Sequence, residues 1–465
     1  MARKHTPGCL VLSFALLLAP SAGAQEIVQL PAGDRWLEVE FEELYRLGTM
    51  AGKDWEQFGY VRSAAFDGAG NLFLFDWLME TQIVFVVGPD GQLARQLGGR
   101  GDGPGEFGSA GAVAVFADGR VIVADVARRG YHLFAADGQI ERLVRMAEVS
   151  AVTSVGPVVA QPGSEAVIGV PTRPTVWTIT GAAFSTPVRF PTSHPFERTI
   201  LSGEETVTDT IAEAWLPPVD ISEMDQTDLV NTAPRPTSRL PEFSPELHWG
   251  VLSDGRVAFS DSSTYAVKVA EAGGGVVRIL TRPFQPESVT SRMIRAEKRR
   301  RVDRLEENAA PGADLPARRR RIEELEFHTE LSVIRGLATT WDGHIWVLRR
   351  GEGPVDDGPI DVLNAGRPLP GQLSCGNDVA AGRLRSGWSG CVRRNERLAS
   401  ADGRGETDEQ GGWRAVTTID ESRMPASGRS RPSLALPPGG DSYRTVVFDE
   451  LDVPYVVRAK ITPMQ

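Results

Sequence analysis

A hairpin-like segment recurs four times along the chain. It joins an apolar run to an Asp/Gly turn and a second run rich in branched or aromatic residues, as in "AVAVFADGRVIVAD" at 112–125. The other copies lie at 63–76, 249–261 and 337–349. Two apolar runs separated by a short glycine-containing turn are typical of a β-hairpin.

A second hairpin-like element follows each copy. These elements lie at 83–98, 131–145, 267–280 and, more faintly, 360–371. Two hairpins make four strands per unit, and the step from Asp76 to Asp125 is 49 residues. Units of about 40 to 50 residues with four strands each are typical of β-propeller blades. The sequence therefore predicts an all-β propeller.

The spacing of the units predicts a six-bladed β-propeller. The interval from Asp125 to Asp261 is close to three periods, so two weaker blades are expected there, one at 155–190 and one within 192–242. We expect the strand-like segment 36–48 to pair with the last blade and close the ring, because an open ring would leave sheet edges unpaired.

Residues 288–330 interrupt the repeat with a charged segment. Its sparse apolar stripe, with Pro316 where a first helical turn accepts proline, predicts a helical hairpin inserted before the last blade. The basic runs at 298–301 and 318–321 are nearly balanced by acidic residues across the segment. We interpret them as a solvated helix surface with i,i+4 ion pairs, and a partner-binding role is the weaker alternative.

A second interruption, residues 372–440, is rich in glycine and arginine and has no strand periodicity. Irregular connections of this length are uncommon inside a domain. One hypothesis is a local frameshift, in the gene or in its sequencing, because a shifted frame from Leu373 to Glu396 encodes a hairpin of the missing type. The segment holds Cys375 and Cys391, which suffice for one disulfide but not for a disulfide framework.

The first 24 residues have the three parts of a secretory signal peptide. Arg3 and Lys4 precede an apolar run at 9–19, and small residues end at Ala24. We therefore expect cleavage near Ala24, periplasmic or extracellular export, and a single propeller domain at 25–465. No later run approaches the roughly 18 apolar residues of a membrane helix, so no membrane span is expected. A formal net charge of −11 argues against a nucleic-acid partner.

Residues 97–143 resemble the NHL-repeat β-propellers. The matching features are Gly-x-Gly-x-Gly-Pro-Gly-Glu-Phe before the blade, Asp-Gly in the first hairpin, Val-Ala-Asp at the end of its second strand, and Phe-x-x-Asp-Gly in the outer hairpin. The similarity is greatest to secreted bacterial six-bladed propellers of unassigned function. It implies that "GRGDGPGEFG" at 99–108 connects two blades, with Phe107 as a plug between them. A phosphate-binding loop would need Gly-Lys-Ser/Thr before a helix.

Propellers usually bind ligands at the mouth of the central channel, where the innermost strands begin. Five residues at or just before those strand starts are the candidate ligand-binding residues: Tyr60, Arg62, His248, Trp249 and Arg335. Arginines, a histidine and aromatic side chains would suit an anionic or sugar-like ligand. The alternative interpretation is that they form hydrogen bonds between blades.

The leading functional hypothesis is a binding or interaction module for an unknown small molecule, protein or peptide, without a required cofactor. The competing hypothesis is a metal-assisted hydrolase or lyase, of the lactonase type, that uses a divalent cation. The sequence shows no recognisable set of metal ligands. Asp76, Asp125 and Asp261 recur at one blade position, and we expect them to cap turns rather than to act as catalytic carboxylates.

Overall fold

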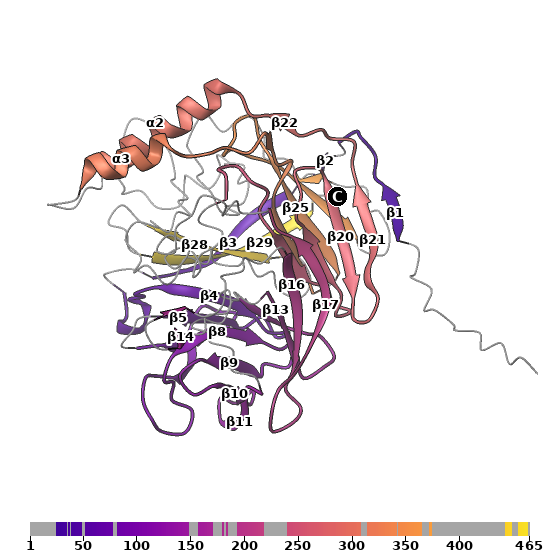
Figure 1. Ribbon diagram of the computed structural model, residues 1–465. Helices are drawn as coiled ribbons and strands as arrows, with labels where there is room; N and C mark the ends of the chain where they lie inside the picture. The colour runs from indigo at the N-terminus through magenta and orange to yellow at the C-terminus, as the bar shows by residue number, and fades with distance from the viewer. Residues whose placement is uncertain are drawn as a thin grey trace, which may run out of the picture.

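The computed structural model of the protein consists mainly of antiparallel β-sheets (Figure 1). It describes residues 25–34, 36–37, 39–48, 52–77, 81–147, 157–170, 179–180, 183–184, 193–217, 240–307, 314–341, 343–364, 372–373, 442–448 and 454–463. The expected signal peptide lies outside these residues, as does most of 372–440, with both of its cysteines and the hypothesised frameshift.

Five sheets follow one another along the chain as blades. The first contains β4 (Val61–Phe66), β5 (Leu72–Asp76), β6 (Ile83–Val87) and β7 (Leu93–Gly98). The second contains β8 (Ala110–Val115), β9 (Val121–Asp125), β10 (Gly130–Phe134) and β11 (Ile140–Arg145). The third contains β12 (Val158–Ala160), β13 (Ala166–Gly169), β16 (Ser193–Ile200) and β17 (Val207–Trp215).

The fourth and fifth blades each gain a strand from the N-terminal segment. The fourth contains β18 (His248–Val251), β19 (Val257–Ser260), β20 (Ala266–Glu271) and β21 (Gly275–Thr281), with β1 (Glu26–Gln29) parallel to β21. The fifth contains β24 (Ile334–Thr339), β25 (His344–Arg350), β26 (Asp357–Asn364) and β27 (Gln372–Leu373), with β2 (Trp36–Leu37) parallel to β27. The first strands of successive blades contact one another in the order β4, β8, β12, β18 and β24. The fold is a β-propeller.

The prediction of six blades is wrong, because the described residues form five. The two weaker blades expected between Asp125 and Asp261 are a single blade. Its second strand, β13, pairs directly with β16, so that Ile168 faces Arg198. Residues 193–215 are therefore the outer half of the blade that 158–169 begin. The extra length of this interval falls between β13 and β16 and between β17 and β18.

A three-stranded sheet brings the two ends of the chain together. It contains β3 (Val39–Leu47), β29 (Pro454–Pro463) and β28 (Ser442–Phe448), with β29 in the centre. Leu47 of β3 packs against the core of the first blade, whereas the adjoining β2 belongs to the fifth. This sheet thus lies between the fifth and first blades (Figure 1). The prediction that 36–48 pairs with the last blade holds only for β2, because β3 pairs with β29 in the three-stranded sheet instead.

The apolar runs of the repeat form the strands in the middle of each blade. Every residue of β5, β9 and β10 is buried. Phe73 and Phe75 of the first blade share one apolar cluster with Val113 and Phe134 of the second. The propeller core therefore lies between blades, where adjacent sheets face each other.

The glycine-rich connector 99–108 links β7 to β8, and Phe107 is its anchor. The Phe107 ring is fully buried, with its centroid 5.4 Å from that of His132 and 6.0 Å from that of Phe134. Gly98 has a φ of 78°, and a Cβ there would lie 1.9 Å from the Phe107 ring. The prediction that Phe107 plugs the space between two blades is confirmed, and the close approach explains the glycine before the connector.

Two helices follow β22 (Glu287–Ser288) and precede β23 (Glu330–Leu331): α2 (Ser291–Glu307) and α3 (Leu315–Glu323). Asp314 caps α3 by accepting a hydrogen bond from the Ala317 N–H, and Pro316 lies in its first turn. The helices contact each other and lie together at one edge of the propeller (Figure 1). In the described residues, neither helix has the length and apolar composition needed to cross a bilayer.

Candidate functional site at the channel mouth

The two faces of the propeller differ in the length of their connections. On one face the strands are joined by short turns, such as those at 67–71 and 116–120. On the opposite face, where each innermost strand begins, the chain runs through 170–192, 216–247 and 282–333 between consecutive long strands. We call this the loop-bearing face. Binding residues are usually carried on long loops above a rigid scaffold, so this face is the candidate functional face.

The strands β4 and β24 each have a β-bulge at the same position, near the loop-bearing face. In the first blade, Val61 and Ser63 face consecutive residues of β5, which leaves Arg62 as the extra residue. In the fifth blade, the same shift between Ile334 and Gly336 leaves Arg335 as the extra residue. A bulge redirects the extra side chain and is common near binding sites. Both arginines that the sequence singled out thus occupy one structural position on two blades.

Arg62 lies against two aromatic residues. Its guanidinium carbon is 5.4 Å from the centre of the Trp77 ring, and the Tyr60 and Trp77 rings meet edge to face at 6.4 Å. Burial lowers the pKa of Arg62 and raises the pKa of Tyr60. Within the described residues, no carboxylate forms an ion pair with Arg62. A half-buried cation without an anionic partner is able to accept one from a ligand.

Arg335 has a different environment, because it already has an anionic partner. Its Nη1 atom lies 3.3 Å from Asp357 Oδ1, and both side chains are largely buried. The two bulge arginines are therefore equivalent in position but not in charge balance. Arg62 is the stronger candidate for binding an anion from outside.

His248 and Trp249 begin β18 on the same face. The Trp249 ring packs edge to face on Phe196 of the third blade at 5.6 Å, and both residues belong to one apolar cluster. Packing between blades accounts for Trp249. Sequence reasoning did not select Trp77, whose indole Nε1 donates a hydrogen bond of 2.9 Å to the Ala110 carbonyl. Trp77 could have been selected from the sequence, because it directly follows the recurring Asp76.

The recurring aspartates cap the turns that enter the innermost strands. Asp76 accepts hydrogen bonds from the backbone N–H groups of Gly59, at 3.0 Å, and Tyr60, at 2.6 Å. Asp125 accepts them from Gly108, at 2.7 Å, and Ser109, at 2.9 Å. These bonds confirm the structural role expected of the repeat aspartates. They also fix the backbone at Tyr60, next to the bulge that presents Arg62.

Two of these aspartates have a basic partner at one cross-strand position. His132 faces the residue two before Asp125, and its Nε2 atom lies 3.4 Å from the carboxylate. Lys268 faces the residue two before Asp261, and its Nζ atom lies 2.7 Å from that carboxylate. Burial disfavours the charge on Asp125, but the contact with His132 and several N–H groups outweigh it and lower its pKa to about 2.

The first blade lacks this basic partner. Phe85 occupies the corresponding place, since it faces Leu74, two residues before Asp76. Burial consequently raises the pKa of Asp76, although the two backbone N–H groups oppose the shift. In the described part of the chain, the first blade thus combines an acidic group that has no basic cross-strand partner with a bulge arginine that has no carboxylate partner.

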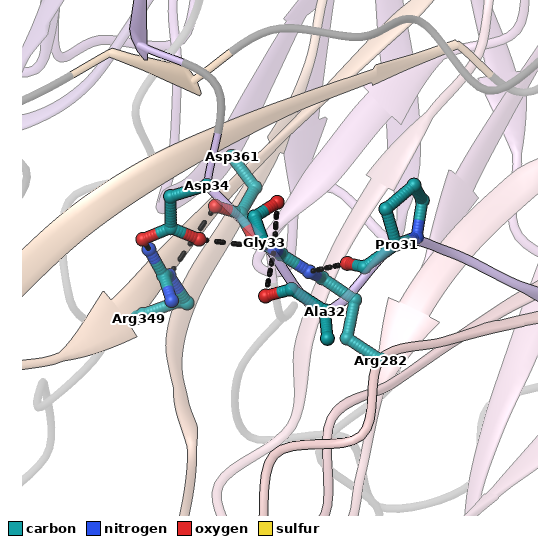
Figure 2. Close-up of polar contacts among 7 residues, drawn as sticks. All are labelled: Pro31, Ala32, Gly33, Asp34, Arg282, Arg349 and Asp361. Carbon is teal, nitrogen blue, oxygen red and sulfur yellow. Dashed lines mark hydrogen bonds and ion pairs between the residues drawn. The ribbon is translucent and has the colours of Figure 1, made fainter.

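The fifth blade reverses the charges of the pair. Arg349 occupies the position of the recurring aspartate, and Asp361 faces the residue two before it. Arg349 Nε lies 3.2 Å from Asp361 Oδ1, and its Nη2 lies 2.7 Å from Asp34 Oδ2 (Figure 2). Arginine cannot accept the backbone hydrogen bonds that the recurring aspartates accept. Arg349 instead donates to the carboxylate of Asp34 in the N-terminal segment.

Arg282, which directly follows β21, completes this buried cluster. Its Nη1 donates to Asp361 at 2.9 Å, its Nη2 to Asp34 at 3.0 Å, and its Nε to the Pro31 carbonyl at 2.9 Å (Figure 2). The Phe284 ring lies 4.6 Å from the Arg282 guanidinium and 4.7 Å from that of Arg349. The side chains of Arg282 and Asp361 are almost completely buried. The cluster fastens residues 31–34 across the fourth and fifth blades.

The described residues contain no group of three or more His, Cys, Asp or Glu side chains arranged to hold a metal ion. The loop-bearing face also carries the Tyr60–Arg62–Trp77 group, the Arg335–Asp357 pair and the Arg282 cluster.

Comparisons with known proteins show similarity at low identity. No family model matches the sequence, and no curated protein matches it. A DUF4221 family member from Bacteroides vulgatus is 12% identical, with a TM-score of 0.46 over 92% of this chain and 100% of that chain. Virginiamycin B lyase from Staphylococcus aureus is 10% identical, with a TM-score of 0.34 over 75% of this chain and 77% of that chain.

A third similar structure is regucalcin, a calcium-binding protein from Agrobacterium tumefaciens. It is 10% identical, with a TM-score of 0.34 over 94% of this chain and 96% of that chain. At TM-scores below 0.5, none of these similarities tells what this protein binds or does.

Proposed function

We propose that the protein is a binding module that holds an anionic ligand at the channel mouth, with Arg62 as the principal contact. The observation that carries the proposal is the state of Arg62: it is presented by a bulge, partly buried, and without a carboxylate partner among the described residues. Burying a cation without an anionic partner costs free energy, which an incoming carboxylate or phosphate would recover.

The neighbours of Arg62 suit a ligand with a flat or ring-shaped part. Trp77 and Tyr60 present aromatic surface beside the guanidinium. A guanidinium beside aromatic rings binds an anionic group in a fixed orientation, while the rings contact the apolar part of the ligand. Arg335 and His248 lie at equivalent strand ends of other blades and are proposed to contact larger ligands.

We further propose that the mature protein is exported after cleavage near Ala24, and that its blades are of the NHL type. The supporting features are the three-part N-terminal segment and the motif at 99–108. The competing proposal remains a metal-assisted hydrolase or lyase on the same scaffold. It differs from the binding module in requiring a bound divalent cation.

The test is calorimetric titration of the purified protein with matched acidic and neutral sugars, such as glucuronate and glucose. Wild type is expected to bind only the acid, and Arg62→Gln is expected to lose at least tenfold in affinity, since a charge-assisted hydrogen bond contributes about 1.5–3 kcal/mol. Arg256→Gln is the matched control, because Arg256 pairs with Asp254 at a turn on the opposite face. Equal loss in both variants would refute the Arg62 site.

Metal analysis of the same preparation separates the two proposals. A near-stoichiometric divalent cation, together with a lower melting temperature after chelation, would favour the enzyme and justify assays with lactones and esters. Metal-free protein that still discriminates glucuronate from glucose would favour the binding module.

A further inference from the structure

The helices α2 and α3 form a basic projection on an acidic chain. The whole protein has a formal net charge of −11, whereas arginine is the commonest residue in both helices. On one side of α2, this charge is neutralised by ion pairs. On the other side of α2, the arginines form no ion pair with the described residues.

The inner side of α2 is attached to the protein body. Glu297 is buried and accepts a hydrogen bond of 2.7 Å from Arg300 Nε and one of 2.9 Å from Arg301 Nε. Arg301 also pairs with Glu242, which precedes β18. The ion pairs Lys298–Glu323 and Arg319–Glu306 connect α2 to α3. These contacts agree with the interpretation of the basic runs as internally paired, but only for the side chains they involve.

The outer side of α2 carries Arg292, Arg295 and Arg299. Their spacing of three and four residues places them on one face of the helix, and at 100° per residue this face is opposite Glu297. The last turns of the helix place two acids on the same face, Asp303 and Glu306, and Glu306 pairs with Arg319 of α3. The three arginine side chains are exposed. None of them forms an ion pair with a carboxylate of the described residues. The exposed side chains of Arg318, Arg320 and Arg321 on α3 likewise have no such partner.

An array of this kind is unfavourable in the isolated protein. Like charges at i and i+4, as in Arg295 and Arg299, destabilise a helix by a few tenths of a kcal/mol. The repulsion is relieved when the array meets a surface of opposite charge. The outer side of the helix pair therefore has the chemistry of a docking surface for an anionic partner.

The composition of the array distinguishes between classes of partner. The large apolar side chains that are exposed in the described residues lie outside α2 and α3. Protein interfaces usually contain aromatic or aliphatic anchors in addition to arginine. Insertion into a bilayer would also require an apolar helix face. A surface of closely spaced phosphates requires neither feature, and each basic residue near an anionic bilayer contributes about 1 kcal/mol.

We propose that the arginine face of α2 and α3 attaches the protein peripherally to an anionic lipid surface, by electrostatics and without insertion. The acidic remainder of the chain is repelled by the same surface, which orients the molecule with the helix pair towards the lipid. This attachment is independent of ligand binding at Arg62.

The experiment is co-sedimentation of the purified protein with vesicles of phosphatidylcholine containing 30% phosphatidylglycerol, at low and at physiological salt. Arg292→Gln/Arg295→Gln/Arg299→Gln should bind on the order of 100-fold more weakly than wild type, from about fivefold for each arginine. The charge-matched control is Arg120→Gln/Arg142→Gln/Arg145→Gln, whose arginines pair with acids on the blades. This control should bind like wild type, and salt should weaken both.

Three results would overturn the proposal. The first is equal binding to vesicles of phosphatidylcholine alone. The second is unchanged binding by the α2 variant, provided that circular dichroism shows its folding to be intact. The third is preferential binding of the helix pair to a polyglutamate peptide or an oligonucleotide that displaces the vesicles, because it would assign the arginine face to another class of partner.

Discussion

Arg349 in the fifth blade occupies the position of Asp125 in the second, and Asp361 occupies the position of His132. The two blades therefore place an acidic and a basic residue in contact at the same two cross-strand positions, in opposite order. Asp125 caps the turn that enters its own blade by accepting backbone hydrogen bonds. Arg349 is unable to do so and instead pairs with Asp34 from the N-terminal segment. This exchange thus attaches the N-terminal segment 31–34 to the fifth blade.

The first prediction concerns the carboxylate at the centre of this cluster. Asp361→Asn would leave the buried guanidiniums of Arg282 and Arg349 with only Asp34 to balance them. Removing one partner of a buried ion pair costs about 3–5 kcal/mol, and we expect a loss of this size in urea unfolding. Asp209→Asn, at the more exposed pair with Arg198, should cost less than about 1 kcal/mol. Similar losses would show that the cluster contributes little.

The second prediction concerns Arg282, which spreads its donors over five acceptors. Besides Asp361 and Asp34, it donates to the carbonyls of Pro31, Ala32 and Gly33. Lysine keeps the charge but lacks the planar fork, so Arg282→Lys should release the N-terminal segment.

Hydrogen exchange measures this release. We expect amides of 26–34 to exchange at least tenfold faster in Arg282→Lys, a change of about 1.4 kcal/mol in local opening. Arg278→Lys is the control, because Arg278 also contacts this segment, through the exposed Glu26. Equally fast exchange in the control would contradict the role of the buried cluster.

The third prediction concerns acid stability. The folded-state pKa of Asp125 is about 2, below its ordinary value of 3.8. A lowered folded-state pKa stabilises the protein above the unfolded-state value, and this stability is lost as the pH falls from about 4 through about 2. Asp125→Asn should therefore cost about 2 kcal/mol at pH 7 and flatten the loss of unfolding free energy over that window.

Asp76 is the contrasting case in the same repeat position. Its pKa is raised by burial, so its contribution to stability is present at low pH and is lost as the pH rises through the raised folded-state value. Asp76→Asn should consequently leave the acid-induced loss between pH 4 and 2 intact. Parallel behaviour of the two variants would show that His132 has no part in the difference.

The fourth prediction tests the close contact behind the glycine-rich connector. In Gly98→Ala, the new Cβ meets the Phe107 ring and the residue keeps a positive φ, which together should cost about 2–4 kcal/mol. Gly99→Ala is the matched control, because Gly99 also has a positive φ but a Cβ there would have no atom within 4 Å. It should cost only the backbone strain, about 1–2 kcal/mol. Equal losses in thermal unfolding would exclude the packing contribution.

Local patterns in the sequence were sufficient for the hairpins, the turn-capping aspartates and Phe107. The blade count failed because the third blade is divided by the connection 170–192, and period counting cannot distinguish a long connection from a weak blade. The Arg282 cluster was also missed. Asp34, Arg282 and Asp361 are far apart in the sequence, and only the parallel pairing of β1 and β2 on neighbouring blades brings them together.

At the candidate site, too, the sequence predicted positions but not contacts. It located the strand starts, and hence Arg62 and Arg335, but their equal spacing gave no reason to expect different charge environments. Their difference comes from β26, where Asp357 supplies a carboxylate to Arg335. Such a partner depends on the register of a different hairpin, which sequence spacing does not specify.

The last prediction uses this difference to separate binding from stability. Arg62→Met removes a partly buried cation that has no carboxylate partner in the described part of the chain, and methionine retains much of the apolar stem. We expect unfolding free energy to stay within about 1 kcal/mol of wild type, or to rise, while affinity for an acidic ligand is lost. Arg335→Met deprives the largely buried Asp357 of its arginine, so it should destabilise by about 1–3 kcal/mol. Urea unfolding and calorimetric titration of both variants provide the comparison. A larger stability loss at Arg62 than at Arg335 would mean that Arg62 serves the fold and would remove it as a binding residue.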